Sequence, residues 1–231
     1  MRTRLLPLAF CLLPFAGFTQ TAYNLSSPNG ALQIAVETTP NLSWRLNLRG
    51  QPLLNTAAIA LEIEGAGILG QQVKVRSTEK RTVNEVQRPP VHQKSAEIPE
   101  RYNELTLHCD GDWGVRFRAY DEGVAYCFFT RFKNREPVTV VNETYHVQMA
   151  NGKTVFFPEE ESFYSHNERV CIPYAPADLN ETKLASLPAL LAAENGVKVL
   201  LTETDLQDYP GLWLRGAFGA KLRGVFPQYP K

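Results

Sequence analysis

The chain has 231 residues, 24 of them basic and 24 acidic, so its formal net charge is zero. No run of like charge stands out, and nucleic-acid binding depends on a basic surface, so we expect no nucleic acid as a partner. The sequence also lacks the serine-hydrolase, zinc-peptidase and phosphate-loop signatures and any spaced Cys/His metal set. We therefore predict no catalytic residue within it.

Residues 1–22 predict a signal peptide. Arg2 and Arg4 precede an apolar stretch over residues 5–18, and a Thr/Gln/Ala cluster follows, which is the order typical of a secretory leader. The apolar stretch is shorter than the roughly 20 residues that a membrane-spanning helix needs. Cys11 follows a phenylalanine, whereas a lipid-modified cysteine is expected after a small residue. We expect an exported protein, periplasmic or extracellular, without a membrane span or lipid anchor.

Three cysteines remain beyond the leader, namely Cys109, Cys127 and Cys171. This odd and widely spaced set is too sparse for a disulfide framework. Cys109 and Cys127 both lie in strand-like runs, so the sequence leaves open whether they form one bridge or remain buried free thiols.

Short alternations of apolar and polar residues, separated by turn residues, follow the leader and are typical of strands. The first of these strands are expected over residues 32–38, 42–48, 58–63 and 73–83. The last is rich in Lys, Arg and Thr, which favours a sheet edge. Residues 87–101 carry three prolines and mixed charge, which favours a loop that crosses between sheets.

Residues 104–129 contain the clearest pattern, with three alternating runs joined by Asp-Gly-Asp and Asp-Glu-Gly turns, which predicts a three-stranded antiparallel meander. Further strands are expected within 138–149 and 153–157, and a buried strand over 197–203. Residues 184–193 could hold a few helical turns, but Pro188 interrupts them. Frequent strands with very little helix predict an all-β fold, a large antiparallel β-sandwich.

The first polar cluster is PEEESFYSHNE at residues 158–168. Aromatic rings stack on the C–H faces of sugars, and amide, imidazole and carboxylate groups bind sugar hydroxyls, so this segment fits a sugar site. The alternative is a solvated acidic loop with Phe163 and Tyr164 turned into the core.

The second polar cluster is LTETDLQDYPGLWL at residues 201–214, where Glu203, Asp205 and Asp208 lie within six residues. Calcium prefers oxygen ligands of this type, so Glu203 at the end of a strand is a candidate ligand. The spacing is not that of an EF-hand. The alternative is a set of ordinary turn-forming acids before a Pro-Gly pair.

These clusters and the meander resemble the N-terminal domain of glycoside hydrolase family 97. The matching segments are RAYDEGVAY at 118–126, ESFYSHNE at 161–168, and TETDL with DYPG at 202–211, in similar order and spacing. The resemblance covers roughly residues 23–230. It implies two regions, a leader over 1–22 and a family 97 N-terminal domain of the β-supersandwich type over 23–231.

Members of that family are exported bacterial α-glucosidases and α-galactosidases that need calcium, and a catalytic (β/α)8 barrel follows their N-terminal domain. The resemblance implies that Glu203 is a calcium ligand in a site shared with the barrel. It also implies that His166, Asn167 and Glu168 face the barrel and contact an α-linked oligosaccharide. Because the chain stops before the last strands of the sandwich and the barrel, we expect it to be inactive alone and to bind calcium weakly or not at all.

Two other functions are compatible with the same pattern. One is a stand-alone periplasmic carbohydrate-binding module that uses exposed aromatics such as Trp113, Tyr164 or Trp213. The other is a purely structural sandwich that binds no ligand.

Overall fold

The structure is a computed structural model that describes residues 22–91, 94–134 and 137–228. The predicted leader therefore lies almost entirely outside the described residues. In chain order the strands are β1 (Ala22–Ser26), β2 (Leu32–Glu37), β3 (Ser43–Leu48), β4 (Gln51–Ala58), β5 (Ala60–Ile63), β6 (Gly67–Leu69), β7 (Val75–Gln87), β8 (Ile98–Cys109), β9 (Trp113–Tyr120), β10 (Val124–Thr130), β11 (Val140–Thr144), β12 (His146–Met149), β13 (Gly152–Glu160), β14 (Cys171–Tyr174), β15 (Leu184–Ala185), β16 (Ala189–Ala193), β17 (Lys198–Leu201), β18 (Trp213–Ala217) and β19 (Lys221–Val225).

The fold is all-β, as the sequence predicts. One short 3-10 turn, Pro176–Asp178, is the only helical element in the described part of the chain. In the same ranges no helix is long and apolar enough to cross a membrane. All the strand pairs named below are antiparallel.

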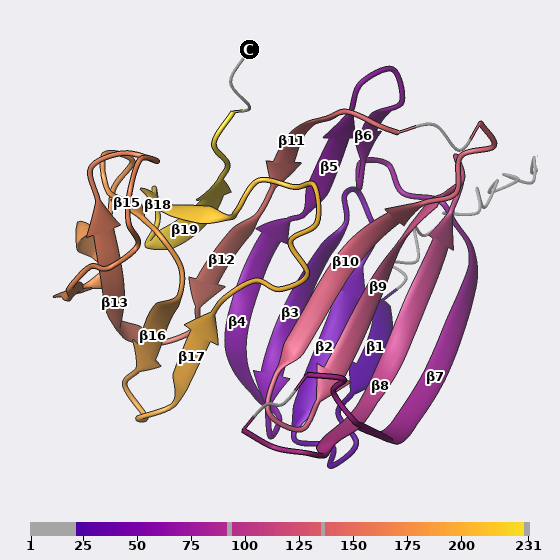
Figure 1. Cartoon of the computed structure of the whole chain (residues 1–231), viewed down its shortest axis with the longest axis horizontal. Helices are drawn as coiled ribbons and strands as arrows, with labels where there is room; N and C mark the ends of the chain where they lie inside the picture. Colours follow the sequence, from indigo (N-terminus) through magenta and orange to yellow (C-terminus); the bar gives the residue numbers. More distant parts are fainter. Residues whose placement is uncertain (1–21, 92–93, 135–136, 229–231) are drawn as a thin grey trace, which may run out of the picture.

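Two sheets packed face to face form the larger body (Figure 1). One contains β1-β2-β3-β4 and the other β10-β9-β8-β7. They pack because alternate residues of their strands are apolar and buried, such as Ile34 and Val36 on β2 and Leu105 on β8. Between the sheets the ring of Trp44 packs edge-on against Phe117, with centroids 6.3 Å apart.

The first sheet continues into a smaller body on the left of Figure 1. Its path from β4 runs β12-β19-β18-β15-β13-β16-β17, and β14 pairs with β13. Phe157 and Leu214 are fully buried in it. A separate three-stranded sheet has the order β11-β5-β6. The two polar clusters begin in the last residues of β13 and β17, so the smaller body supports both.

The meander over residues 104–129 is confirmed as β8, β9 and β10, which pair in that order. The edge-strand prediction for residues 73–83 is also confirmed, because β7 has a neighbour on one side only. Residues 184–193 form β15 and β16 and no helix.

Two local predictions are wrong. Residues 87–101 are not a crossing loop, because β7 extends to Gln87, β8 begins at Ile98, and these two residues pair. They form the end of one long hairpin, since direct strand pairing outweighs the local signal of the prolines. The strand at 197–203 is buried on one face only, because β17 is the last strand on its sheet path: Leu201 lies in the core, whereas Leu200 is 57% exposed.

The described cysteines are free, so the alternative of a bridge between Cys109 and Cys127 is not realised. Cys109 is buried in the core and Cys127 is exposed. Burial raises the pKa of the Cys109 thiol to about 11, which leaves it protonated at neutral pH.

Candidate functional site

The Glu203 loop, residues 202–212, connects β17 to β18. Both carboxylate oxygens of Glu203 accept the backbone N–H of Leu212, each at 2.9 Å, so the loop is closed at its base. A Cβ at Gly211 would lie 3.3 Å from Oε1 of Glu203, and the glycine thus gives the carboxylate room. Partial burial raises the pKa of Glu203, although the Leu212 N–H opposes that shift. The loop holds one carboxylate in the wall of a cavity.

A second carboxylate, Glu143 on β11, holds the middle of this loop. The Tyr209 hydroxyl donates a hydrogen bond of 2.7 Å to Oε2 of Glu143. The Tyr209 ring also packs at 80° against Phe226, with centroids 5.9 Å apart. Burial raises the pKa of Glu143, and the nearby charge of Glu203 adds to the shift. The sequence analysis missed Glu143, because an isolated glutamate in a polar strand carries no recognisable pattern.

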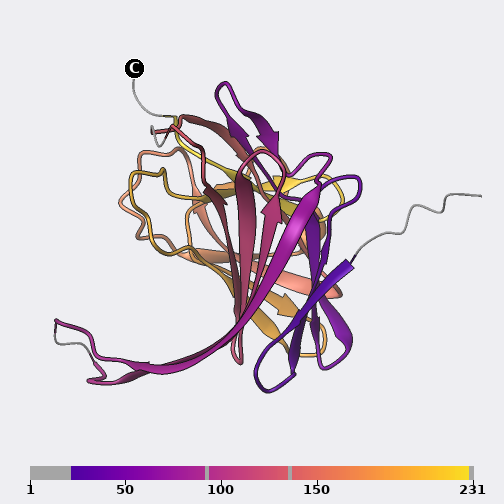
Figure 2. The ribbon, with the colours of Figure 1, turned by 90° about the vertical axis from the view of Figure 1, so that its right-hand side faces the viewer.

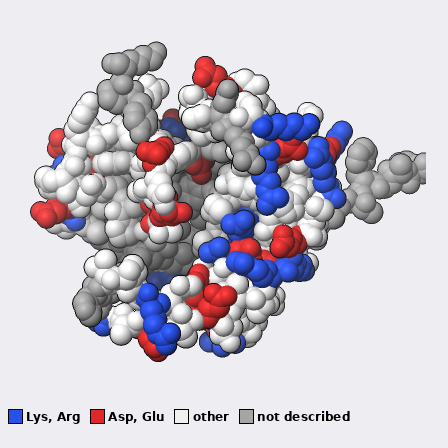
Figure 3. Space-filling model, turned by 45° about the vertical axis from the view of Figure 1, so that its right-hand side comes forward, with Lys and Arg blue, Asp and Glu red and all other residues white. Residues whose placement is uncertain are grey.

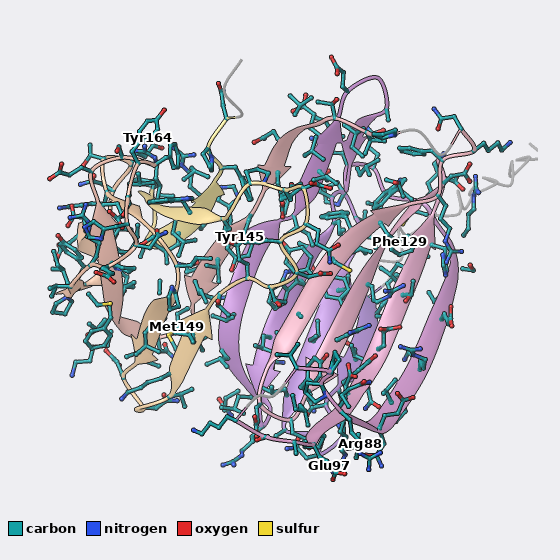
Figure 4. The ribbon with its side chains drawn as sticks, in the orientation of Figure 1. Arg88, Glu97, Phe129, Tyr145, Met149 and Tyr164 are labelled. Carbon is teal, nitrogen blue, oxygen red and sulfur yellow. The ribbon has the colours of Figure 1, made fainter. Side chains whose placement is uncertain are left out.

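Both carboxylates line a cavity of about 780 Å³ between the two sheets of the sandwich and the Glu203 loop. Trp44, Tyr126 and Tyr145 contribute aromatic rings to its wall, and Tyr145 is labelled in Figure 4. Burial raises the pKa of Tyr126 well above its usual value, so its hydroxyl remains a hydrogen-bond donor. Apolar walls with a few polar groups are the usual lining of a ligand cavity.

The His166 loop, residues 161–170, follows β13 and is held by Glu160, whose side chain is fully buried. Ser165 Oγ donates to Oε1 of Glu160 at 2.7 Å, and Ser186 Oγ donates to the same atom at 3.1 Å. Arg169 Nε donates to Oε2 at 2.6 Å. The carboxylate thereby fixes both ends of the Ser-His-Asn-Glu segment.

The three predicted sugar-contacting residues, His166, Asn167 and Glu168, are all exposed on this loop. Asn167 has a left-handed backbone with φ 58°, and the backbone N–H of Glu168 donates to Nδ1 of His166 at 3.1 Å. Among the described residues no hydrogen bond or ion pair joins this loop to the Glu203 loop. The structure thus organises the two clusters separately.

The aromatic residues near these loops differ from the predictions. Phe163 packs edge-on against Trp213, with centroids 5.3 Å apart, whereas Tyr164 is 95% exposed and points away from the body (Figure 4). The alternative that turned both rings into the core is therefore wrong for Tyr164. Trp113 and Trp213 are buried, so two of the three aromatics considered for a stand-alone sugar-binding surface do not reach solvent.

The described residues contain no group of three or more His, Cys, Asp or Glu side chains that could hold a metal ion. Glu203 offers hard carboxylate oxygens, which are suitable as one calcium ligand. Both of these oxygens share the Leu212 N–H. The residues at this loop therefore fit one ligand of a site and not a complete ligand set.

The fold is shared with about a third of the length of two solved enzyme structures. A glycoside hydrolase family 97 enzyme from Pseudoalteromonas sp. strain K8, solved with acarbose, superposes with a TM-score of 0.76 and 16% identity over 88% of this chain and 32% of that one. A crystal structure of a β-arabinopyranosidase superposes with a TM-score of 0.77 and 20% identity, over 89% of this chain and 35% of that one. These likenesses establish the fold.

The family model for the glycosyl-hydrolase 97 N-terminal domain matches residues 25–228, and the chain belongs to this family. A retaining α-galactosidase of Bacteroides thetaiotaomicron is 31% identical over 222 residues, which are 92% of this chain and 33% of the relative. The chain thus spans about a third of the length of the curated relative that it matches. The resemblance read from the three sequence motifs is confirmed.

Proposed function

We propose that this N-terminal domain serves an exported hydrolase of α-glucosides or α-galactosides, and that it completes the substrate site of a catalytic (β/α)8 barrel. The observation that carries the proposal is the family match over residues 25–228, together with the 31% identity to a retaining α-galactosidase. The Arg-rich, apolar start of the sequence supports export to the periplasm or the cell exterior.

Within that site Glu203 supplies one calcium ligand. This role is supported by the position of the carboxylate, which is anchored by the Leu212 N–H and lines the cavity. A calcium ion takes six to eight oxygen ligands, and bound calcium would stabilise negative charge near the sugar. Because the described residues contain no group of three or more such ligands, and Glu143 in the same cavity already accepts a hydrogen bond from Tyr209, the remaining ligands come from the barrel, and the chain alone binds calcium weakly or not at all.

His166, Asn167 and Glu168 contact the α-linked oligosaccharide or the barrel surface beside it. Two observations support this role: all three residues are exposed, and Glu160 holds the loop that carries them. An exposed segment on a fixed loop pays little ordering entropy when it binds, because its backbone is already in one conformation.

A chimera tests the function. Residues 25–228 would replace the matching third of the Bacteroides α-galactosidase, and hydrolysis of p-nitrophenyl α-galactoside and α-glucoside would be measured against calcium concentration. We expect activity with one of these substrates and a calcium requirement. Glu203→Gln keeps an acceptor for the Leu212 N–H but removes the charge, so it should raise the half-saturating calcium concentration by about tenfold or more.

The matched control is Glu194→Gln, an exposed glutamate outside the Glu203 loop, which should leave the calcium dependence unchanged. An equal effect of both variants would contradict the role of Glu203. Calorimetric titration of the chain alone provides an independent check, since tight calcium binding without the barrel contradicts a shared site.

A further inference from the structure

The ends of β7 and β8 form a two-stranded ribbon, which the structure describes over residues 84–91 and 94–101. Pairing between β8 and β9 begins at Tyr102, so Ile98–Arg101 pair with β7 alone, opposite Asn84–Gln87. In Figure 2 this ribbon leaves the sandwich and extends to the lower left, well beyond the other strands. Its last described ion pair joins Arg88 and Glu97 at 2.7 Å (Figure 4). Within the described ranges no third strand pairs with the ribbon.

The ribbon is poorly suited to stand alone in water. A two-stranded hairpin without a packed face is marginally stable. Val86, Val91 and Ile98 are 52%, 71% and 38% exposed, so its apolar side chains are not covered. Glu85 lies directly opposite Glu100, and like charges at such a position destabilise a strand pair. These features are those of a segment that is covered by another surface.

The direction in which the ribbon extends indicates which surfaces a partner would contact. In Figure 2 the gold and orange loops of the smaller body extend to the same side of the molecule as the ribbon, the left of the view, with the four-stranded sheet to their right. A globular body placed against this side would meet the ribbon and these loops at once. The Glu203 loop is part of the gold segment.

The outer face of the four-stranded sheet is charged. The buried carboxylate of Glu104 is 2.8 Å from Arg118, 3.6 Å from Arg116 and 3.7 Å from Arg81. Three arginines surround this glutamate, and Glu79, 3.8 Å from His108, is a second acid on the same face, so a small excess of positive charge remains there. Elsewhere on this side basic and acidic side chains are interspersed (Figure 3). A partner that is acidic opposite the arginines and basic opposite the Glu85–Glu100 pair would match this face.

We propose that the β7–β8 ribbon is a docking element for the catalytic domain of the same polypeptide, which it contacts while the Glu203 loop contacts that domain at the other end. The inference rests on the proposed function. The relative at 31% identity has about two thirds of its length outside the matched part, so a body large enough to span both contacts belongs to such proteins. The ribbon thereby fixes the orientation of the Glu203 carboxylate relative to the barrel.

Hydrogen exchange of the ribbon amides tests the proposal. In the chain alone, residues 84–101 should exchange rapidly. In the chimera with the Bacteroides catalytic part, they should exchange about tenfold more slowly or more, because opening then requires the partner contact to break. The double charge reversal Glu85→Lys with Glu100→Lys should remove this protection. The control reversal Glu64→Lys with Glu194→Lys, at exposed sites outside the ribbon, should not.

If the charge reversal prevents folding, a variant with a shortened ribbon provides a second test. Replacing residues 86–99 by Asn-Gly joins the directly opposed Glu85 and Glu100 through a two-residue hairpin turn. The shortened chain should keep its melting temperature, whereas its chimera should melt earlier than the unshortened chimera.

Unchanged exchange of the ribbon in an active chimera would overturn the docking role while leaving the proposed function standing. A protected ribbon in an inactive chimera would contradict the proposed function while leaving the docking role standing. Protection that appears in the chain alone as its concentration rises, together with a doubled mass in sedimentation, would assign the ribbon to a second copy and also overturn the proposal.

Discussion

Replacing Glu160 by alanine should destabilise the domain and release the His166 loop. The carboxylate is fully buried and accepts hydrogen bonds from Ser165, Ser186 and Arg169 at 2.6–3.1 Å. A hydrogen bond to a charged group contributes about 1.5–3 kcal/mol, and the Arg169 contact is discounted because that side chain is one-third exposed. We therefore expect a loss of about 3 kcal/mol in the free energy of unfolding.

Urea denaturation at pH 7 measures this loss, and hydrogen exchange locates it. The amides of residues 161–170 should lose their protection in Glu160→Ala. The neighbouring variant Glu161→Ala is a matched control, because Glu161 is exposed. It should change the free energy of unfolding by less than about 0.5 kcal/mol.

The pH dependence provides the stricter test. Burial alone would raise the pKa of Glu160, but the hydrogen bonds from Ser165, Arg169 and Ser186 outweigh it and hold the pKa below its usual value. A carboxylate with a lowered pKa stabilises the fold above its unfolded pKa, and this contribution is lost as pH falls through the folded pKa. The difference between wild type and Glu160→Ala should therefore shrink in acid. Equal stability at pH 7, or a difference that persists undiminished at acid pH, would refute the reasoning.

Two further substitutions test the pH dependence that Glu143 gives the fold and the tight packing around Gly114. Burial raises the pKa of Glu143, so the folded state holds this proton more tightly than the unfolded chain, and the free energy of unfolding should fall as pH rises through the raised pKa. Thermal melts of Glu143→Gln at several pH values should lack that decline, and a parallel decline in both proteins would contradict the assignment. Gly114→Ala should destabilise by about 2 kcal/mol or more in urea, since its Cβ would lie 2.4 Å from both the Leu107 carbonyl and the Phe129 ring. Gly123→Ala, which meets nothing within 4 Å, should be nearly neutral, and similar losses in both variants would rule out the steric explanation.

Much of the fold could be predicted because the strand signal is local. A run such as residues 104–109 alternates apolar and polar residues, and that period alone determines which side chains face a core. The same holds for the family motifs, which keep their order along the chain and need no coordinates to be recognised. The misplaced loop at residues 87–101 marks the limit of local signals, because whether a proline-containing segment continues a hairpin depends on the strand opposite it.

The candidate site depends on contacts between distant residues, and these only the tertiary structure decided. Glu143 and Tyr209 are 66 residues apart and meet because the chain returns across the sandwich after β17. Glu160 belongs to a run of three glutamates that look alike in sequence, yet it is buried and bonded while Glu161 is exposed. The sequence by itself determined the period-two strands, the Glu203 motif and the family. Strand order and burial then decided which carboxylates are anchored, because desolvation and hydrogen bonding depend on neighbours that the linear sequence does not specify.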